Sequence, residues 1–148
     1  MKRALNQAEL QFPSSSVNEG FARAAAACFA AQLDPTLEEV NDIKTAVSEA
    51  VTNCIVHAYP DSIGAITLKL RQQPGNVLEI VVRDWGAGIE DVDRAREPLY
   101  TTGGADRSGM GFTIMESFMD SLRVRSVPGR GTTVTMKKKI AQRAPAFR

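Results

Sequence analysis

The feature that most constrains the fold is a change of hydrophobic period partway along the chain. From Val17 to Ala58 apolar residues recur at helical spacing, whereas from Ala65 onward most of them alternate with polar residues. A helix with the first pattern and a strand with the second each have one apolar face. Such faces are buried against another layer, so the pattern predicts helices packed on a sheet.

Two helices are predicted before Ala58. Ser16 with Glu19, and Thr36 with Glu39, have the spacing of capping boxes. The first helix is expected to run to about Gln32, and the second is expected to end near Ala58, before a tyrosine and a proline. The residues expected to be buried are Val17, Phe21, Ala24, Ala25, Cys28 and Phe29 on the first helix and Val40, Ile43, Val47, Val51 and Cys54 on the second. Both cysteines are therefore expected to be reduced packing residues.

Alternating runs predict five strands. One covers residues 5–12, and those at 65–71 and 77–84 flank a Pro-Gly-Asn turn. The last two, at 122–126 and 132–138, are joined by Pro-Gly-Arg-Gly, and short helices are expected around 90–96 and 112–119. The expected fold class is α/β (α+β), a two-layer sandwich with a mixed, mainly antiparallel sheet and helices on one face.

Length and charge narrow the class of protein. The 148 residues suit one domain over 1–148, with about 140–148 as a flexible tail. Lys and Arg total 18 against 17 for Asp and Glu. The chain therefore has no overall positive electrostatic potential that would attract nucleic acid or an anionic membrane. No apolar run approaches a membrane span, and the start lacks the apolar core of a signal peptide. A cytoplasmic location is expected.

A polar stripe follows the second predicted helix. Glu49, Asn53 and His57 recur every four residues and so share one face. A carboxylate there can act as a base, and an amide oxygen can bind Mg²⁺. A solvated helix face is the simpler interpretation of this triplet alone. The chain has 1 histidine, so a zinc site is not expected.

Two glycine motifs follow. Asp84-Trp85-Gly86-Ala87-Gly88 comes directly after a predicted strand, so a flat ligand could approach the backbone while the carboxylate accepts a hydrogen bond, as from an adenine amino group. The second motif, at 108–111, precedes a helix, where free N–H groups favour phosphate, with Arg107 beside it. Each motif alone is typical of a simple turn, and no dinucleotide-binding or P-loop fingerprint is present. Their order after the polar stripe is what indicates a nucleotide site.

These residues resemble the GHKL ATPase superfamily of histidine kinases, gyrase and Hsp90. The resemblance lies in an N box (Glu49, Asn53), a first glycine box (Asp84, Gly86, Gly88) and a second (Gly109, Gly111). More closely, segments 48–53, 98–102 and 107–116 resemble the anti-sigma F factors of endospore-forming bacteria, and the likeness runs from about residue 10 to 138. This resemblance implies the Bergerat ATP-binding fold. It also implies a serine kinase that sequesters a sigma factor, usually as a homodimer, and phosphorylates an anti-anti-sigma protein.

The resemblance also implies roles for individual residues. Glu49 would be the general base and Asn53 the Mg²⁺ ligand, while Arg23 and Arg107 would contact partners. The residues implied to bind ATP or ADP are Asn53, Asp84, Gly86, Gly88, Thr101, Thr102, Arg107, Ser108, Gly109, Met110, Gly111 and Thr132. Segment 101–107 would be a lid whose order depends on the nucleotide, with Gly103 and Gly104 as hinges.

Three other interpretations stay open at this point. An anti-sigma kinase of the general stress response would share the fold and the chemistry. A pure binding module would use ATP only to hold its shape, although Glu49 argues against this. A histidine kinase core is a third option, but the chain has no room for a helix pair bearing a phospho-accepting histidine.

Overall fold

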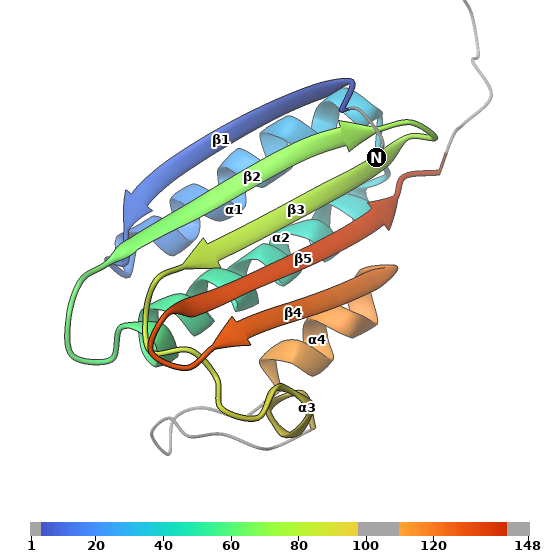
Figure 1. Ribbon diagram of the computed structural model, residues 1–148. Coiled ribbons are helices and arrows are strands. Elements are labelled where there is room, and N and C mark those ends of the chain that lie inside the picture. The colour runs from blue at the N-terminus through green and yellow to red at the C-terminus, as the bar shows by residue number, and fades with distance from the viewer. Residues whose placement is uncertain (1–3, 98–109, 142–148) are drawn as a thin grey trace, which may run out of the picture.

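The sheet of this protein has five strands in the order β1-β2-β3-β5-β4 (Figure 1). The structure is a computed structural model and describes residues 4–97 and 110–141. The strands are β1 (Asn6–Pro13), β2 (Ala65–Gln73), β3 (Val77–Asp84), β4 (Ser121–Val127) and β5 (Gly131–Lys139). The helical elements are α1 (Val17–Ala30), η1 (Ala31–Leu33), α2 (Leu37–Asn53), η2 (Cys54–Ala58), α3 (Val92–Ala95) and α4 (Gly111–Phe118).

Every strand pairing in the described sheet is antiparallel. The expected fold class is therefore confirmed, but the sheet is not mixed. β3 and β4 run in the same direction, yet β5 lies between them and pairs with both (Figure 1). The short hairpin from β4 to β5 returns the chain beside β3, which removes any need for a parallel pairing.

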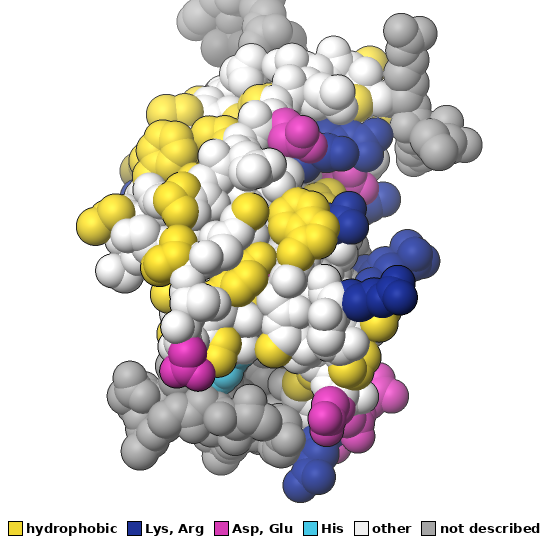
Figure 2. All heavy atoms as spheres, turned by 60° about the vertical axis from the view of Figure 1, so that its left-hand side comes forward, with side chains coloured by type: hydrophobic (Ala, Val, Ile, Leu, Met, Phe, Trp, Pro, Cys, Tyr) yellow, Lys and Arg dark blue, Asp and Glu magenta, His cyan; other side chains and the backbone are white. Residues whose placement is uncertain are grey.

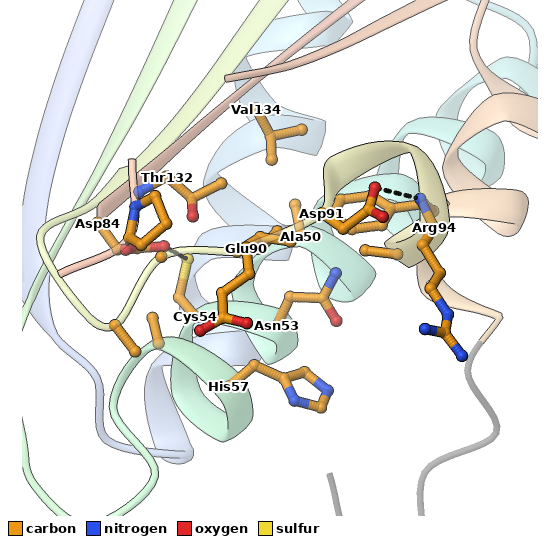
Figure 3. Close-up of a pocket in the computed structure, with 18 of the residues that line it drawn as sticks. Ala50, Asn53, Cys54, His57, Asp84, Glu90, Asp91, Arg94, Thr132 and Val134 are labelled. Atoms are coloured by element: carbon orange, nitrogen blue, oxygen red, sulfur yellow. Dashed lines mark hydrogen bonds between the residues drawn. The ribbon is translucent and has the colours of Figure 1, made fainter. Parts of the chain in front are cut away.

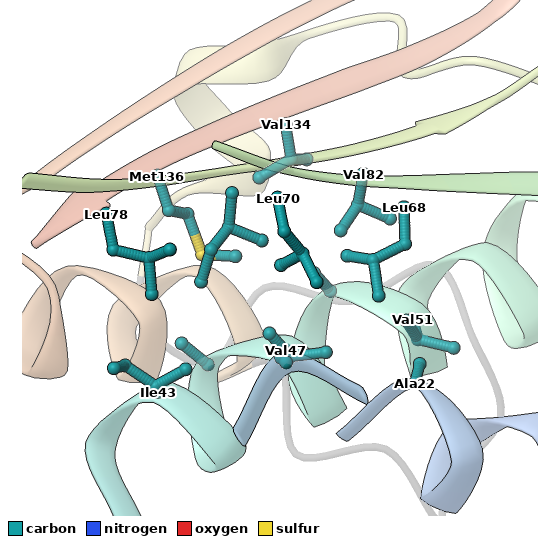
Figure 4. Close-up of a cluster of buried hydrophobic side chains, with 14 of the residues drawn as sticks. Ala22, Ile43, Val47, Val51, Leu68, Leu70, Leu78, Val82, Val134 and Met136 are labelled. Carbon is teal, nitrogen blue, oxygen red and sulfur yellow. The ribbon is translucent and has the colours of Figure 1, made fainter. Parts of the chain in front are cut away.

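The core lies between one face of the sheet and the helices α1, α2 and α4 (Figures 1 and 4). α2 lies between α1 and α4 and contacts both. Its residues Ile43, Val47 and Val51 are fully buried and face inward side chains of the central strands, as the sequence predicts. The strand residues in this layer include Leu68, Leu70, Leu78, Ile80, Val82 and Met136. Truncating such a residue to alanine typically costs about 2–5 kcal/mol.

The buried face predicted for α1 is wrong apart from Phe29. The helix buries Ala22, Ala26, Phe29 and Ala30, whereas Val17 is 77% and Phe21 is 50% exposed. Cys28 is exposed as well, contrary to expectation, while Cys54 is buried as expected. The helix is so rich in alanine that both faces look apolar in sequence, and the small residues are the ones that pack closely. Hydrophobic side chains therefore gather on the surface that carries β1 and α1 (Figure 2).

Only one of the two predicted capping boxes forms. The Glu39 N–H donates to Thr36 Oγ1 at 3.1 Å, and the Thr36 N–H donates to Glu39 Oε1 at 2.9 Å. The Ser16 side chain makes no capping hydrogen bond. The carboxylate of Glu19 instead accepts hydrogen bonds from Arg23 and from Ser48 of α2. A tertiary partner has replaced the local one.

The helix that begins at Leu37 changes character before it ends. α2 has α-helical geometry to Asn53 and continues as a π-helical turn, η2, to Ala58, where the sequence predicts the end. Such π turns widen the helix locally and occur often at functional sites. Among residues 4–97 and 110–141, no helix is both long and apolar enough to cross a membrane.

Candidate functional site

A cavity of about 660 Å³ lies at the end of the helix layer. Its walls come from α2 and η2, the loop after β3, α3, the start of α4, and the turn between β4 and β5 (Figure 3). The volume is within the range of small-molecule sites. The cavity therefore brings together Asn53 and His57 of the predicted polar helix face and, as far as the structure describes them, both predicted glycine motifs.

Asp84 forms the inner wall of this cavity and is 4% exposed. Its Oδ1 accepts the N–H groups of Gly86 at 3.0 Å and Thr132 at 3.1 Å. Its Oδ2 accepts the thiol of Cys54 at 3.4 Å (Figure 3). Burial raises the pKa of Asp84, and these three hydrogen bonds oppose the rise. Burial, and then the negative charge of Asp84, raise the pKa of Cys54, so the thiol stays protonated and can donate.

The glycines after Asp84 have a packing role that the sequence did not indicate. A Cβ on Gly86 would lie 2.3 Å from the carbonyl oxygen of Ala58, where the Ala87 N–H also donates at 3.0 Å. Gly88 has φ +75°, and a Cβ there would lie 2.4 Å from the carbonyl oxygen of Val127. Of these two glycines, Gly88 lines the cavity and Gly86 does not. The loop therefore needs glycines to fit between η2 and the β4–β5 turn.

Glu49, the predicted general base, and Asn53, the predicted Mg²⁺ ligand, lie beside the start of α4. A Cβ on Gly111 would lie 3.2 Å from both amide atoms of Asn53 and 3.4 Å from Glu49 Oε1. Asn53 and Gly111 line the cavity, whereas Glu49 lies outside the lining residues. Met110 is the N-cap of α4. A carboxylate and an amide thus face a helix N-terminus, where unpaired N–H groups favour phosphate.

The donor set decides which metal ion could bind here. Within the described residues, no group of three or more His, Cys, Asp or Glu side chains could hold a metal ion. The Asn53 amide offers one neutral oxygen ligand at the cavity wall. This fits Mg²⁺, which retains water and phosphate ligands and needs few protein ligands.

Several predicted site residues cannot be placed. Thr101, Thr102, Arg107, Ser108 and Gly109 lie outside the described residues, as does the predicted lid at 101–107. Their roles stay predictions.

Comparison with known proteins identifies the family. The chain matches the histidine kinase-like ATPase domain over residues 12–138. It is 58% identical over 136 residues to the anti-sigma F factor of a Thermoanaerobacter species, covering 91% of this chain and 94% of that one. It is 57% identical over 138 residues to the anti-sigma F factor of Caldanaerobacter subterraneus, and this match covers 93% of this chain and 96% of that one. The chain belongs to the anti-sigma F factor family. The GHKL resemblance read from its boxes is confirmed.

The fold is shared with solved ATPase domains. The structure of the RsbU and RsbW domains of a Mycobacterium tuberculosis protein matches with a TM-score of 0.70 at 18% identity. That match covers 97% of this chain and 35% of the longer one. At this identity the likeness shows the fold alone.

Arg23, which was predicted to contact partner proteins, is not a freely solvated arginine. Its guanidinium donates to Glu19 Oε2 at 2.8 Å and to Ser48 Oγ at 3.3 Å, and its side chain is 41% exposed. Ser48 directly precedes Glu49 in α2. The contact therefore ties the surface of α1 to the helix that carries the N box.

The sequence did not indicate several residues of the cavity. Glu90, Asp91 and Arg94 line its outer wall, and the Asp91 carboxylate accepts the Arg94 N–H at 3.1 Å to cap α3 (Figure 3). An aspartate immediately before a short helical run is a local signal that could have identified this cap. Cys54 was interpreted as packing alone because it continues the apolar stripe. Its position one residue after Asn53 was the signal available.

Proposed function

We propose that this chain is an anti-sigma factor that binds a sporulation sigma factor, sigma F-like, and uses ATP to phosphorylate a serine of an anti-anti-sigma protein. The proposal depends on one observation above all. Gly111 lies against both Asn53 and Glu49, at a cavity whose inner wall is Asp84. A metal ligand and an adenine acceptor thus line one ligand-sized space, and a base lies beside it at Gly111, which favours a kinase over a module that only sequesters.

The nucleotide would be recognised from both ends of the cavity. The amino group of adenine would donate to Asp84, while Thr132 holds the carboxylate through its N–H. The phosphates of ATP or ADP would lie toward the start of α4, with further contacts from Arg107, Ser108 and Gly109 as the resemblance implies. The Asn53 amide oxygen would hold Mg²⁺, which neutralises phosphate charge when bound.

Glu49 is the residue we propose as general base. The serine oxygen of the partner would form a bond to the γ-phosphorus, the bond to the ADP oxygen would break, and the serine proton would pass to the Glu49 carboxylate. Positioning and charge neutralisation account for most of the rate in such transfers, so a modest base suffices. The position of Glu49 outside the cavity lining suits a group that meets a protein substrate at the rim.

The partners would meet the surface formed by α1. Arg23 is partly exposed on this helix, which also exposes the apolar side chains Val17 and Phe21. The relatives at 57–58% identity are named for sigma F, which favours a sporulation sigma factor over one of the general stress response. The homodimeric state stays a prediction from the resemblance, and the cytoplasmic location stays a prediction from the hydrophobic pattern of the sequence.

Partner binding can be tested by charge reversal with a matched control. We expect the wild type to co-elute with its sigma F-like partner in Mg-ATP, and Arg23→Glu to weaken binding at least about tenfold. Arg123→Glu on the exposed face of β4 is the control and should leave binding unchanged. Failure of the wild type to bind the sigma factor with ATP, with ADP or without nucleotide would overturn the anti-sigma proposal.

A further inference from the structure

We infer that Cys54 is a positioning residue for Asp84, and that it sets the preference of the site for a 6-amino purine over a 6-oxo purine. The inference rests on the proposed ATP site and extends it to a residue for which the sequence indicated only packing. Cys54 is 4% exposed and is also a lining residue of the cavity. Its thiol meets the carboxylate that would read the base.

The hydrogen bonds of Asp84 leave little acceptor capacity free. A carboxylate has about four lone-pair sites. Two are taken at Oδ1 by the Gly86 and Thr132 N–H groups, and one is taken at Oδ2 by the Cys54 thiol. One site at Oδ2 remains, which matches a single donor such as one N–H of an amino group.

The segment from Cys54 to Tyr59 contacts both the side chain of Asp84 and the backbone next to it. Cys54 begins η2 and contacts the side chain, whereas Tyr59, just after η2, contacts the next residue of the backbone. The Tyr59 hydroxyl accepts the Trp85 N–H at 2.7 Å and donates to the Ala65 carbonyl oxygen at 2.7 Å. The backbone at Asp84 is therefore fixed independently of the thiol. The Gly86 and Thr132 N–H groups hold Oδ1, and the thiol adds the one described contact to Oδ2, which further restricts a terminal torsion that is intrinsically broad.

A thiol suits this role better than a stronger donor. A thiol is a weak hydrogen-bond donor, so Oδ2 can still accept a strong hydrogen bond from the ligand. A 6-oxo purine would present an acceptor to this oriented carboxylate, and two acceptors facing each other in a buried site are unfavourable. Without the thiol, only the two bonds at Oδ1 orient the carboxylate, Oδ2 is held less firmly, and the discrimination weakens.

The test compares ATP with ITP, which carries an oxo group in place of the amino group. Dissociation constants are measured by calorimetry on the full chain for wild type, Cys54→Ala, Cys54→Ser and Cys28→Ala, the last a matched control at the exposed cysteine. We expect Cys54→Ala to weaken ATP binding about tenfold and ITP binding less than about twofold. Cys54→Ser, which retains a donor, should keep most of the preference, and Cys28→Ala should match the wild type.

Thermal unfolding separates positioning from general damage. A merely structural role would weaken both nucleotides equally in Cys54→Ala, in step with a lower Tm, and an unchanged ATP-to-ITP ratio in that variant would overturn the inference. Cys54→Val, which lacks a donor and is close to cysteine in size, gives the same comparison if the alanine variant does not fold. If the wild type bound neither nucleotide, the proposed ATP site would be wrong and this inference with it. If instead Cys54→Ala bound ATP with the same preference over ITP as the wild type, the ATP site would stand and only the role of Cys54 would be wrong.

Discussion

At the scale of single residues, the Asp84 carboxylate is held by three donors in a place that solvent barely reaches. Its burial raises its pKa above the ordinary value of 3.8, because the charged form loses hydration that the hydrogen bonds only partly replace. A raised pKa in the folded state means that the native protein binds this proton more tightly than the unfolded chain does. The resulting stability is fully present below the ordinary value and is lost as pH rises through the folded pKa.

This sign gives a testable pH dependence. We expect the free energy of unfolding of the wild type, minus that of Asp84→Asn, to decrease as pH rises from about 3.5 toward 7. The asparagine variant lacks this titration, so the difference isolates the one carboxylate. Urea unfolding of both proteins across the pH range measures it. A difference that grew with pH would mean that the hydrogen bonds outweigh burial.

Much of the site could be predicted residue by residue. Asp84, Asn53 and Gly111 were identified from motif spacing, because each motif is local in sequence. Cys54 could not be identified in this way, because its partner Asp84 is 30 residues away and only the fold brings them together. A buried thiol in an apolar stripe has the same sequence pattern whether it packs or donates.

At the scale of elements, the loop after β3 is a turn fitted between η2 and the β4–β5 hairpin. Gly88 and Gly129 offer a direct comparison, because their φ angles are +75° and +78°. A Cβ on Gly88 would meet the Val127 carbonyl oxygen at 2.4 Å, whereas a Cβ on Gly129 would meet nothing within 4 Å.

Alanine at the two glycines should therefore have different effects. Both substitutions carry the left-handed backbone penalty of about 1–2 kcal/mol. Gly88→Ala adds a collision with backbone, and we expect it to cost at least about 2 kcal/mol more than Gly129→Ala. Denaturant unfolding measures both values. Equal destabilisation would show that the loop can move away from the hairpin.

The capping boxes show where prediction from the sequence ends at this scale. Thr36 and Glu39 pair as their spacing predicts, and the Ala141 N–H, which also donates to Glu39, uses the other carboxylate oxygen, Oε2, and leaves Oε1 to the cap. Glu19 has the same spacing from Ser16, but Ser48 and Arg23 take its carboxylate. The competitor Ser48 is 29 residues away in the sequence, so local spacing could not reveal it.

At the scale of the whole molecule, the two-layer arrangement could be predicted from the sequence. The face of α1 that is buried against the other elements could not. Alternation fixes the inward face of each strand, since a shift of one residue reverses every side chain. An alanine-rich helix has no such constraint. Ala22 is completely buried and Ala24 is exposed, although both were equally plausible core residues by composition.

Enlarging these two alanines tests how α1 is packed. We expect Ala22→Leu to lower the free energy of unfolding by about 1–3 kcal/mol, because the added side chain has no space in a close-packed core. Ala24→Leu should change it by less than about 0.5 kcal/mol. Thermal or urea unfolding distinguishes them, and the reverse ranking would mean that the helix presents the face predicted from the sequence.

The most direct test of the central claim is transfer of the γ-phosphoryl group. Wild type and Glu49→Gln are incubated with γ-labelled Mg-ATP and the anti-anti-sigma protein encoded by the same organism, and ATP binding is measured in parallel. We predict label on a serine of the partner with the wild type, and at least about a hundredfold slower transfer by Glu49→Gln with ATP affinity retained. No transfer by the wild type despite tight ATP binding, or undiminished transfer by the variant, would contradict the kinase mechanism.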